Sequence, residues 1–239
     1  MKKRRKAVGV AVCCAAVSLS AANVAEASEE GTLSRPERAE TEENGKLIFI
    51  GDSRTEGIRD AVDDDSIWSC KCSMGYDWMS STGVPDIEDE IDEYTSVIIL
   101  MGVNDLYNIN NYVNYINNKA IEWAGIGAKT YFVSVGPVEN DKYTTNTEIE
   151  SFNSEMEENL VGVNYIDVYS YLTENGYTTL DGTHYPDGVS EDIYDYILDS
   201  RRYKEWNLGL KERKWAYQQI VNTVLTTAMM RIMNAIPVK

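Results

Sequence analysis

The fold can be traced to eight residues, LIFIGDSR at positions 47–54. The first four are uniformly apolar, which is typical of a strand buried on both faces of a sheet. The apolar run stops at Gly51, and Asp52 and Ser53 follow it where a helix can begin. We therefore predict a buried strand that turns directly into a helix, with Ser53 at the turn.

The same pattern recurs along the chain. Further strands are predicted at 66–69, 96–101, 130–135 and 164–168. Helices are predicted at 55–62, 85–93, 109–125, 147–160 and 189–199. Strands that alternate with helices pair in parallel and carry helices on both faces. The sequence thus predicts an α/β fold, a three-layer α/β/α sandwich around a five-stranded parallel sheet, with reactive residues in loops beyond the carboxyl ends of the strands.

The first 27 residues are typical of a signal peptide. A basic stretch at 2–6 precedes a weakly apolar run of small residues at 7–25, and Ala25-Glu26-Ala27 fits the signal-peptidase site. A single membrane anchor is the alternative, but alanine, serine and glycine make the run a poor spanning segment. We expect cleavage after about Ala27 and a secreted or cell-surface location.

Charge is distributed unevenly along the chain. Residues 28–200 include 36 acidic and 9 basic side chains, a net charge of −27, whereas residues 201–239 include 8 basic and 2 acidic, a net charge of +6. An acidic body repels phosphate backbones, which argues against nucleic-acid binding by the main domain and against a strongly anionic substrate. Residues 28–45 are polar and charged, so we expect a disordered acidic spacer before a domain at 46–200.

The C-terminal segment 201–239 is predicted to be a basic amphipathic helical extension. Its apolar residues recur at helical spacing: Tyr217, Ile220, Val221, Val224, Leu225, Ala228, Met229, Ile232 and Met233. Two roles are open. The helix packs on its own acidic domain, which we favour, or it contacts a membrane surface or a partner.

The cysteines and the single histidine give no metal signature. Cys13 and Cys14 would leave with the signal peptide, so Cys70 and Cys72 remain. On a strand their Cα atoms would be about 6.6 Å apart, near the upper limit for a disulfide, and both a bridge and two free thiols stay open. With no Cys-x-x-Cys pair, we expect no metal site.

Three groups after predicted strands could perform chemistry. Ser53 lies where a helix N-terminus offers free N–H groups, although Asp52 or Ser53 could simply cap that helix. Asn104 follows the strand at 96–101 and could donate to a developing negative charge, or could serve only as a turn residue. His184, the only histidine, follows the fifth strand, with Asp181 three residues upstream to orient its imidazole. Together they supply nucleophile, oxyanion donor and oriented base.

These segments resemble a known family. GDSR (51–54), MGVND (101–105) and DGTHY (181–185) look like the first, third and fifth sequence blocks of the SGNH, or GDSL-like, hydrolases. The resemblance covers about residues 46–199 and implies the flavodoxin-like fold of that family. Arg54 departs from the full GDSL tetrad, at a position that varies among members.

The resemblance also implies a role for each site residue. Ser53 is the nucleophile, and Asp181 and His184 complete the catalytic triad. The oxyanion hole is formed by the Ser53 N–H, a second-block glycine N–H and the Asn104 side chain. Gly75 is our choice for that glycine, with Gly83 as the alternative.

The function that the resemblance implies is a secreted serine esterase acting on short acyl esters, a mechanism for which we expect neither a metal nor an organic cofactor. We expect acetyl groups, carried by a small ester or an acylated carbohydrate, because no large apolar insertion suggests a lid or a long acyl tunnel. The 16 tyrosines could provide surfaces for sugar rings or simply fill the core. The alternatives are an acyltransferase that uses the same site and a non-catalytic cell-surface binding protein.

Overall fold

The computed structural model describes the backbone of residues 45–234 and the side chains of residues 45–211, 214, 215 and 218. The predicted signal peptide and the spacer up to residue 44 lie outside the described residues. Five strands form one sheet: β1 (Leu47–Gly51), β2 (Ile67–Cys70), β3 (Ser96–Leu100), β4 (Lys129–Val133) and β5 (Val163–Ile166). Every strand pair is parallel, and the order is β2-β1-β3-β4-β5. The predicted five-stranded parallel sheet is confirmed.

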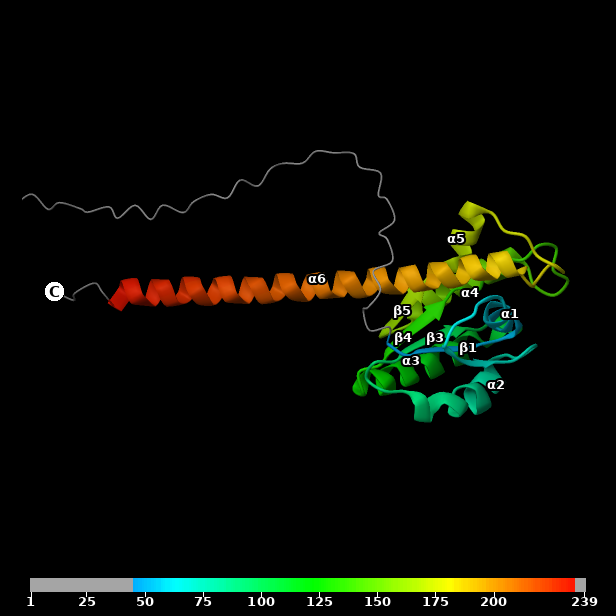
Figure 1. Cartoon of the computed structure of the whole chain (residues 1–239), viewed down its shortest axis with the longest axis horizontal. Helices are drawn as coiled ribbons and strands as arrows, with labels where there is room; N and C mark the ends of the chain where they lie inside the picture. Colours follow the sequence, from blue (N-terminus) through cyan, green and yellow to red (C-terminus); the bar gives the residue numbers. More distant parts are fainter. Residues whose placement is uncertain (1–44, 235–239) are drawn as a thin grey trace, which may run out of the picture. The chain divides into compact units, whose positions relative to one another are not determined.

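One face of the sheet carries α3 (Ile109–Gly125) and α4 (Asn146–Asn159). Figure 1 shows α3 across the strands from α6 (Asp187–Asn234). Alternate strand side chains point toward the face that carries α3 and α4, so Ile48, Val97 and Phe132 share one core with residues of both helices. Within this core Tyr112 of α3 meets Phe152 of α4 edge to face, with ring centroids 5.9 Å apart. The burial of aromatic and branched side chains between helix and sheet is the main stabilising contribution here.

The opposite face carries α1 (Ser53–Ala61), α5 (Val168–Asn175) and the first turns of α6 (Asp187–Asn234). Phe49, Ile98 and Tyr131 lie side by side in the strand register and form the floor of a second core. Helices on both faces make the predicted three-layer α/β/α sandwich, which is confirmed.

The connection from β2 to β3 differs from the prediction. Two short turns that were not predicted come first, α2 (Tyr76–Trp78) and the π-helix η1 (Met79–Gly83). The expected helix at 85–93 is replaced by the shorter 3-10 helix η2 (Pro85–Glu90). Residues 86–93 include six acidic side chains and no basic one. Like charges three and four residues apart disfavour an α-helix, which explains the tighter and shorter turn. Another 3-10 turn, η3 (Leu106–Asn108), precedes α3.

The region after β5 contains one helix that the pattern did not predict. α5 separates β5 from the loop that holds His184, so this loop does not follow the strand directly. Asp167 caps α5 by accepting a hydrogen bond from the Ser170 N–H, and this cap was the available signal in the sequence. After the loop, α6 runs through the boundary expected at residue 200 as one continuous helix.

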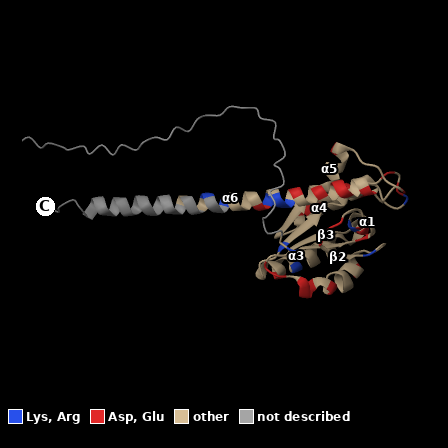
Figure 2. Cartoon of the chain, in the orientation of Figure 1, with Lys and Arg blue, Asp and Glu red and all other residues tan. Residues whose placement is uncertain are grey.

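Acidic side chains dominate the first turns of α6, and Arg201, Arg202 and Lys204 follow them (Figure 2). No helix of the described part of the chain is both long and apolar enough to cross a membrane. Cys70 and Cys72 are not bonded to each other: Cys70 is half-buried, whereas Cys72 is exposed.

Candidate active site

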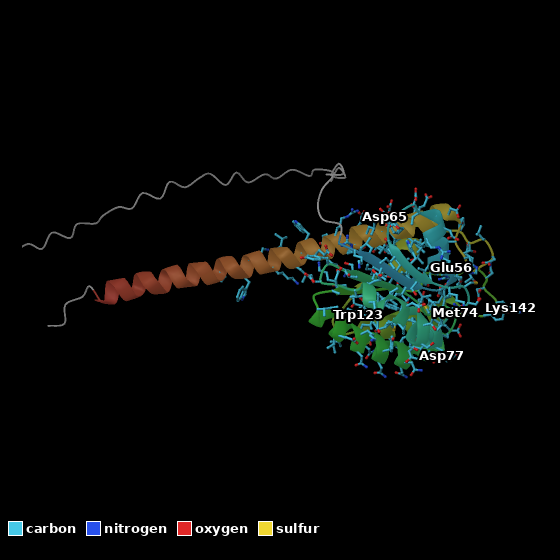
Figure 3. The ribbon with its side chains drawn as sticks, turned by 60° about the horizontal axis from the view of Figure 1, so that its bottom comes forward. Glu56, Asp65, Met74, Asp77, Trp123 and Lys142 are labelled. Atoms are coloured by element: carbon cyan, nitrogen blue, oxygen red, sulfur yellow. The ribbon has the colours of Figure 1, made fainter. Side chains whose placement is uncertain are left out.

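The loops at the carboxyl ends of the strands meet at one end of the domain. Figure 3 shows Glu56, Met74 and Lys142 at this end and Trp123 at the opposite end. β1 lies between β2 and β3, where Gly51 pairs with both Cys70 and Leu100. The loop after β2 and the loop after β3 therefore flank the start of α1.

Ser53 is the first residue of α1, directly after the cap residue Asp52. Asp52 has extended backbone, and its Oδ1 accepts the Arg54 N–H at 2.9 Å. The Ser53 N–H has no partner within the helix and lies at the positive end of the helix dipole. Gly51 is required before this turn because a side chain there would overlap Thr55 and the Leu100 carbonyl oxygen. Asp52 thus caps the helix, and the Ser53 N–H has no partner within the helix.

Asp52 is almost completely buried, with 2% of its surface exposed. This burial raises the pKa of Asp52 to about 6, against the opposing effect of the nearby Arg54 charge. The group beside the nucleophile thus titrates close to neutral pH.

Ser53, His184 and Asp181 form a continuous hydrogen-bonded chain. Ser53 Oγ lies 2.8 Å from His184 Nε2, and His184 Nδ1 lies 2.8 Å from Asp181 Oδ2. The His184 N–H also donates to Asp181 Oδ1, at 2.9 Å. The backbone bond has the largest effect on the pKa of Asp181 and the bond from the imidazole the next largest. Together they hold this pKa well below its usual range.

A carboxylate only accepts hydrogen bonds, so Nδ1 carries the imidazole proton and Nε2 is free to accept one from Ser53. The serine proton therefore points at the base that would remove it. The site is also open: the side chains of His184 and Asp181 are 38% and 57% exposed. A large substrate could reach the serine without passing through a tunnel.

The predicted oxyanion donors lie together in the loops beside Ser53. Asn104 follows β3, and its Nδ2 donates to the Met74 carbonyl oxygen at 2.8 Å, which leaves its second proton available. Gly75, the next residue along from Met74, precedes α2. The side-chain donor and the glycine N–H thus come from adjacent loops.

The structure favours Gly75 over Gly83 as the second-block glycine. Gly83 is buried at the end of η1, where its carbonyl oxygen accepts the Ser69 hydroxyl at 2.8 Å. A side chain at Gly83 would overlap the Trp78 ring, so this glycine serves packing under the sheet.

Arg54 is a site residue whose role the sequence did not predict. Its side chain is buried, and its Nε donates to the Thr183 carbonyl oxygen at 3.0 Å while its Nη1 donates to the Gly136 carbonyl oxygen at 2.8 Å. The guanidinium also lies 5.0 Å from the centroid of the Tyr185 ring. Arg54 therefore ties the His184 loop to the helix that carries the nucleophile. A single sequence gives no signal for such a role.

The loop after β4 supports the His184 loop from the other side. The Thr183 hydroxyl donates to the Asp141 carboxylate, and the Tyr185 hydroxyl donates to the Pro137 carbonyl oxygen at 2.6 Å. Burial raises the pKa of Tyr185 to about 12, so this hydroxyl stays a donor at neutral pH. His184 is thus held by bonds to both neighbouring residues.

Comparison with known proteins gives structural similarity alone. No family model matches the chain, and no curated protein matches it. Among solved structures it is similar to a GDSL-like lipase from Bacteroides thetaiotaomicron, with a TM-score of 0.55 at 20% identity over 68% of this chain and 89% of that one.

Two further structures have a TM-score of 0.51. One is the C-terminal catalytic domain of Streptococcus pneumoniae peptidoglycan O-acetyltransferase A, at 16% identity over 67% of this chain and 94% of that one. The other is an acetyl xylan esterase, at 15% identity over 65% and 98%. These similarities show that the chain has the fold of GDSL-like hydrolases.

Proposed function

We propose that this chain, which has the fold of the SGNH or GDSL-like hydrolases, is a serine esterase that cleaves short acyl esters through an acyl-serine intermediate. The observation that carries the proposal is the chain of hydrogen bonds from Ser53 Oγ to His184 Nε2 and from His184 Nδ1 to Asp181. A serine that only caps a helix does not need a histidine oriented by a carboxylate.

Each group has a defined part in the reaction. His184 Nε2 takes the Ser53 proton as Oγ attacks the ester carbonyl carbon, and the N–H groups of Ser53 and Gly75 with the Asn104 amide stabilise the oxyanion. The imidazolium is stabilised by Asp181 and then protonates the leaving alcohol. Water, activated by His184 in the same way, releases the acyl group and restores Ser53.

A fluorophosphonate probe tests this assignment independently of any natural substrate. We expect the probe to add to Ser53, as located by peptide mass spectrometry, and His184→Ala to slow the labelling strongly because the serine then lacks its base. Asn111→Ala, an exposed change on α3, serves as the control. Unlabelled wild-type protein would instead favour a non-catalytic cell-surface binding protein.

We propose an acetylated carbohydrate as the substrate. The open site suits a short acyl group on a bulky alcohol, and two highly exposed tyrosines lie in the surrounding loops: Tyr107 just after Asn104, and Tyr143, whose N–H donates to Asp141. Tyrosine rings are suited to stacking on sugars. The structural neighbour named as an acetyl xylan esterase supports the same substrate class.

Acetate release from acetylated xylan and from acetylated peptidoglycan, compared with hydrolysis of p-nitrophenyl octanoate, tests the substrate. Good turnover of the octanoyl ester with no acetate from either glycan would refute it.

Acyl transfer is the second candidate. One structural neighbour is the catalytic domain of an O-acetyltransferase, and an exposed His184 could activate an incoming sugar hydroxyl in place of water. Product analysis with a competing alcohol separates the two: transfer gives a new ester, whereas hydrolysis gives only acetate.

Export is also part of the proposal. We propose that the protein is secreted or held at the cell surface after cleavage near Ala27, as the first 27 residues suggest. The N-terminal sequence of protein recovered from the culture medium or the cell surface tests this. An intact Lys2–Lys6 stretch on that protein would show an uncleaved anchor.

We propose two alternative roles for the segment 201–239: packing on its own domain, or contact with a membrane surface or a partner. Tyr203, Trp206 and Trp215 are each more than half exposed, which supports contact with another surface. Glu205, in contrast, pairs with Lys129 of β4 at 3.2 Å, which supports packing on the domain. A truncation after Asn207 keeps that ion pair. Lost stability without an effect on liposome binding supports packing on the domain, and lost liposome binding at unchanged stability supports membrane contact.

A further inference from the structure

Asp105 is a buried carboxylate that the proposed mechanism does not use. Its side chain accepts hydrogen bonds from three donors: the Tyr76 N–H at 2.8 Å and Asn108 Nδ2 at 2.9 Å on Oδ2, and the Tyr112 hydroxyl at 2.6 Å on Oδ1. Only 8% of the residue is exposed. Within the described part of the chain, no cationic side chain lies within ion-pair distance of it. A buried carboxylate needs such donors, and these three come from α2, η3 and α3.

Two adjacent residues hold the peptide groups on either side of Gly75. Asn104 binds the Met74 carbonyl oxygen, and Asp105 binds the Tyr76 N–H. A peptide group is planar and trans, so its carbonyl oxygen and its N–H point in opposite directions. Because the Met74 carbonyl and the Gly75 N–H belong to one peptide group, fixing the carbonyl also fixes the direction of the N–H. The hydrogen bond from the Tyr76 N–H to Asp105 prevents rotation of the peptide group on the other side of Gly75.

Gly75 and Asp105 also fit each other sterically. A Cβ on Gly75 would overlap the Asp105 carboxyl group, so only glycine allows the backbone to approach the carboxylate so closely. The φ of Gly75 is −128°, which any residue can adopt, so space and not backbone conformation requires glycine here.

We propose that Asp105 is the positioning residue of the oxyanion hole: it holds the Met74–Tyr76 loop so that the Gly75 N–H and the Asn104 amide stay directed at the acyl oxygen of a substrate on Ser53. This rests on the proposed esterase function. Asp105 acts through the loop and does not touch the substrate.

A carboxylate suits this position better than an amide. It accepts all three donors at once, whereas an asparagine offers one acceptor oxygen and would turn an NH₂ group toward one of the donors. Burial and the bond to Asp105 raise the pKa of Tyr112 above its usual range, so this hydroxyl remains a donor. A negative charge near the oxyanion opposes catalysis electrostatically, so the benefit has to come from fixed geometry.

The test compares Asp105→Asn with Asp77→Asn, the same change at an exposed carboxylate of α2. Steady-state hydrolysis of p-nitrophenyl acetate is measured well below the unfolding temperature of each variant. We expect Asp105→Asn to lower kcat about 10- to 100-fold with KM changed less than about threefold, because misplaced donors weaken transition-state binding. The Asp77→Asn control should retain kcat within about threefold.

A second readout separates positioning from general folding. A phenylboronic acid forms a tetrahedral adduct on serine, and its inhibition constant for Asp105→Asn should rise by a factor similar to the loss in kcat. The Tyr76 amide hydrogen should exchange faster with solvent in Asp105→Asn alone. A wild-type-like kcat in folded Asp105→Asn would overturn the proposal. Failure of the esterase assignment itself is distinguishable, because wild-type protein would then turn over no ester.

Discussion

Replacement of Arg54 by alanine should destabilise the domain and slow catalysis together. The change removes two hydrogen bonds from a charged donor, to the Thr183 and Gly136 carbonyl oxygens, and the contact with the Tyr185 ring. Hydrogen bonds to charged groups contribute about 1.5–3 kcal/mol each, and a buried cation–π contact contributes about 2 kcal/mol. Relief from burying an unpaired charge offsets part of this. We expect the free energy of unfolding to fall by about 2–4 kcal/mol, which for a protein of this size lowers Tm by roughly 4–16 °C.

The catalytic effect follows from the position of Thr183 beside His184. A displacement of about 1 Å in a catalytic group costs about 100-fold in rate, so we expect kcat to fall about 10- to 100-fold. Urea unfolding gives the stability, and ester hydrolysis on folded protein gives kcat.

Arg59 offers a matched control on the same helix. Its guanidinium is partly exposed and pairs with the exposed Asp60, so Arg59→Ala should cost less than about 1 kcal/mol and leave kcat unchanged. An Arg54→Ala protein as stable and as active as Arg59→Ala would refute the idea that Arg54 holds the His184 loop.

Three more perturbations give distinct outcomes. Asp181→Asn should lower kcat by about 10³- to 10⁴-fold while unfolding stays nearly unchanged, because the imidazole loses its tautomer; a loss below tenfold would contradict this. Burial raises the pKa of Asp52 to about 6, above about 3.9 in the unfolded chain, so its stabilising contribution is complete below about pH 4 and lost as the pH rises through 6. Over this pH range the free energy of unfolding, measured with urea, should fall by up to about 3 kcal/mol less in Asp52→Asn than in the wild type, and parallel pH curves for the two proteins would disprove this. Truncation after Asn207 should lower Tm by less than about 5 °C, since the neighbouring Trp206 and Trp215 side chains are exposed; a larger fall in calorimetry would show packing on the domain.

The sheet was predictable because its strands are buried on both faces. Runs such as 97–100 consist of apolar side chains with no polar interruption, and parallel pairing follows from the helices between them. The helix at 85–93 was predicted wrongly because the spacing of apolar residues alone does not account for the repulsion among six neighbouring acidic side chains. α5 was missed because eight residues after a short strand give a weak periodic signal.

Some residues of the candidate site were predictable from the sequence, and others were not. Ser53, Asp181, His184 and Asn104 stand out because each is a reactive residue type in a loop at one edge of the sheet. Arg54 and Asp105 were not predicted, since their roles depend on contacts with residues distant in the sequence: Arg54 reaches Gly136 and Thr183, and Asp105 reaches Tyr76. Such contacts become visible only when the loops are placed in space.

Hydrolysis of p-nitrophenyl acetate by residues 28–239, compared with the Ser53→Ala and His184→Ala variants, is the most direct test of the serine esterase assignment. The assignment predicts turnover by the wild type and a loss of at least about 10³-fold in both variants, with all three proteins equally folded. Three proteins that hydrolyse the ester at the same rate would contradict it.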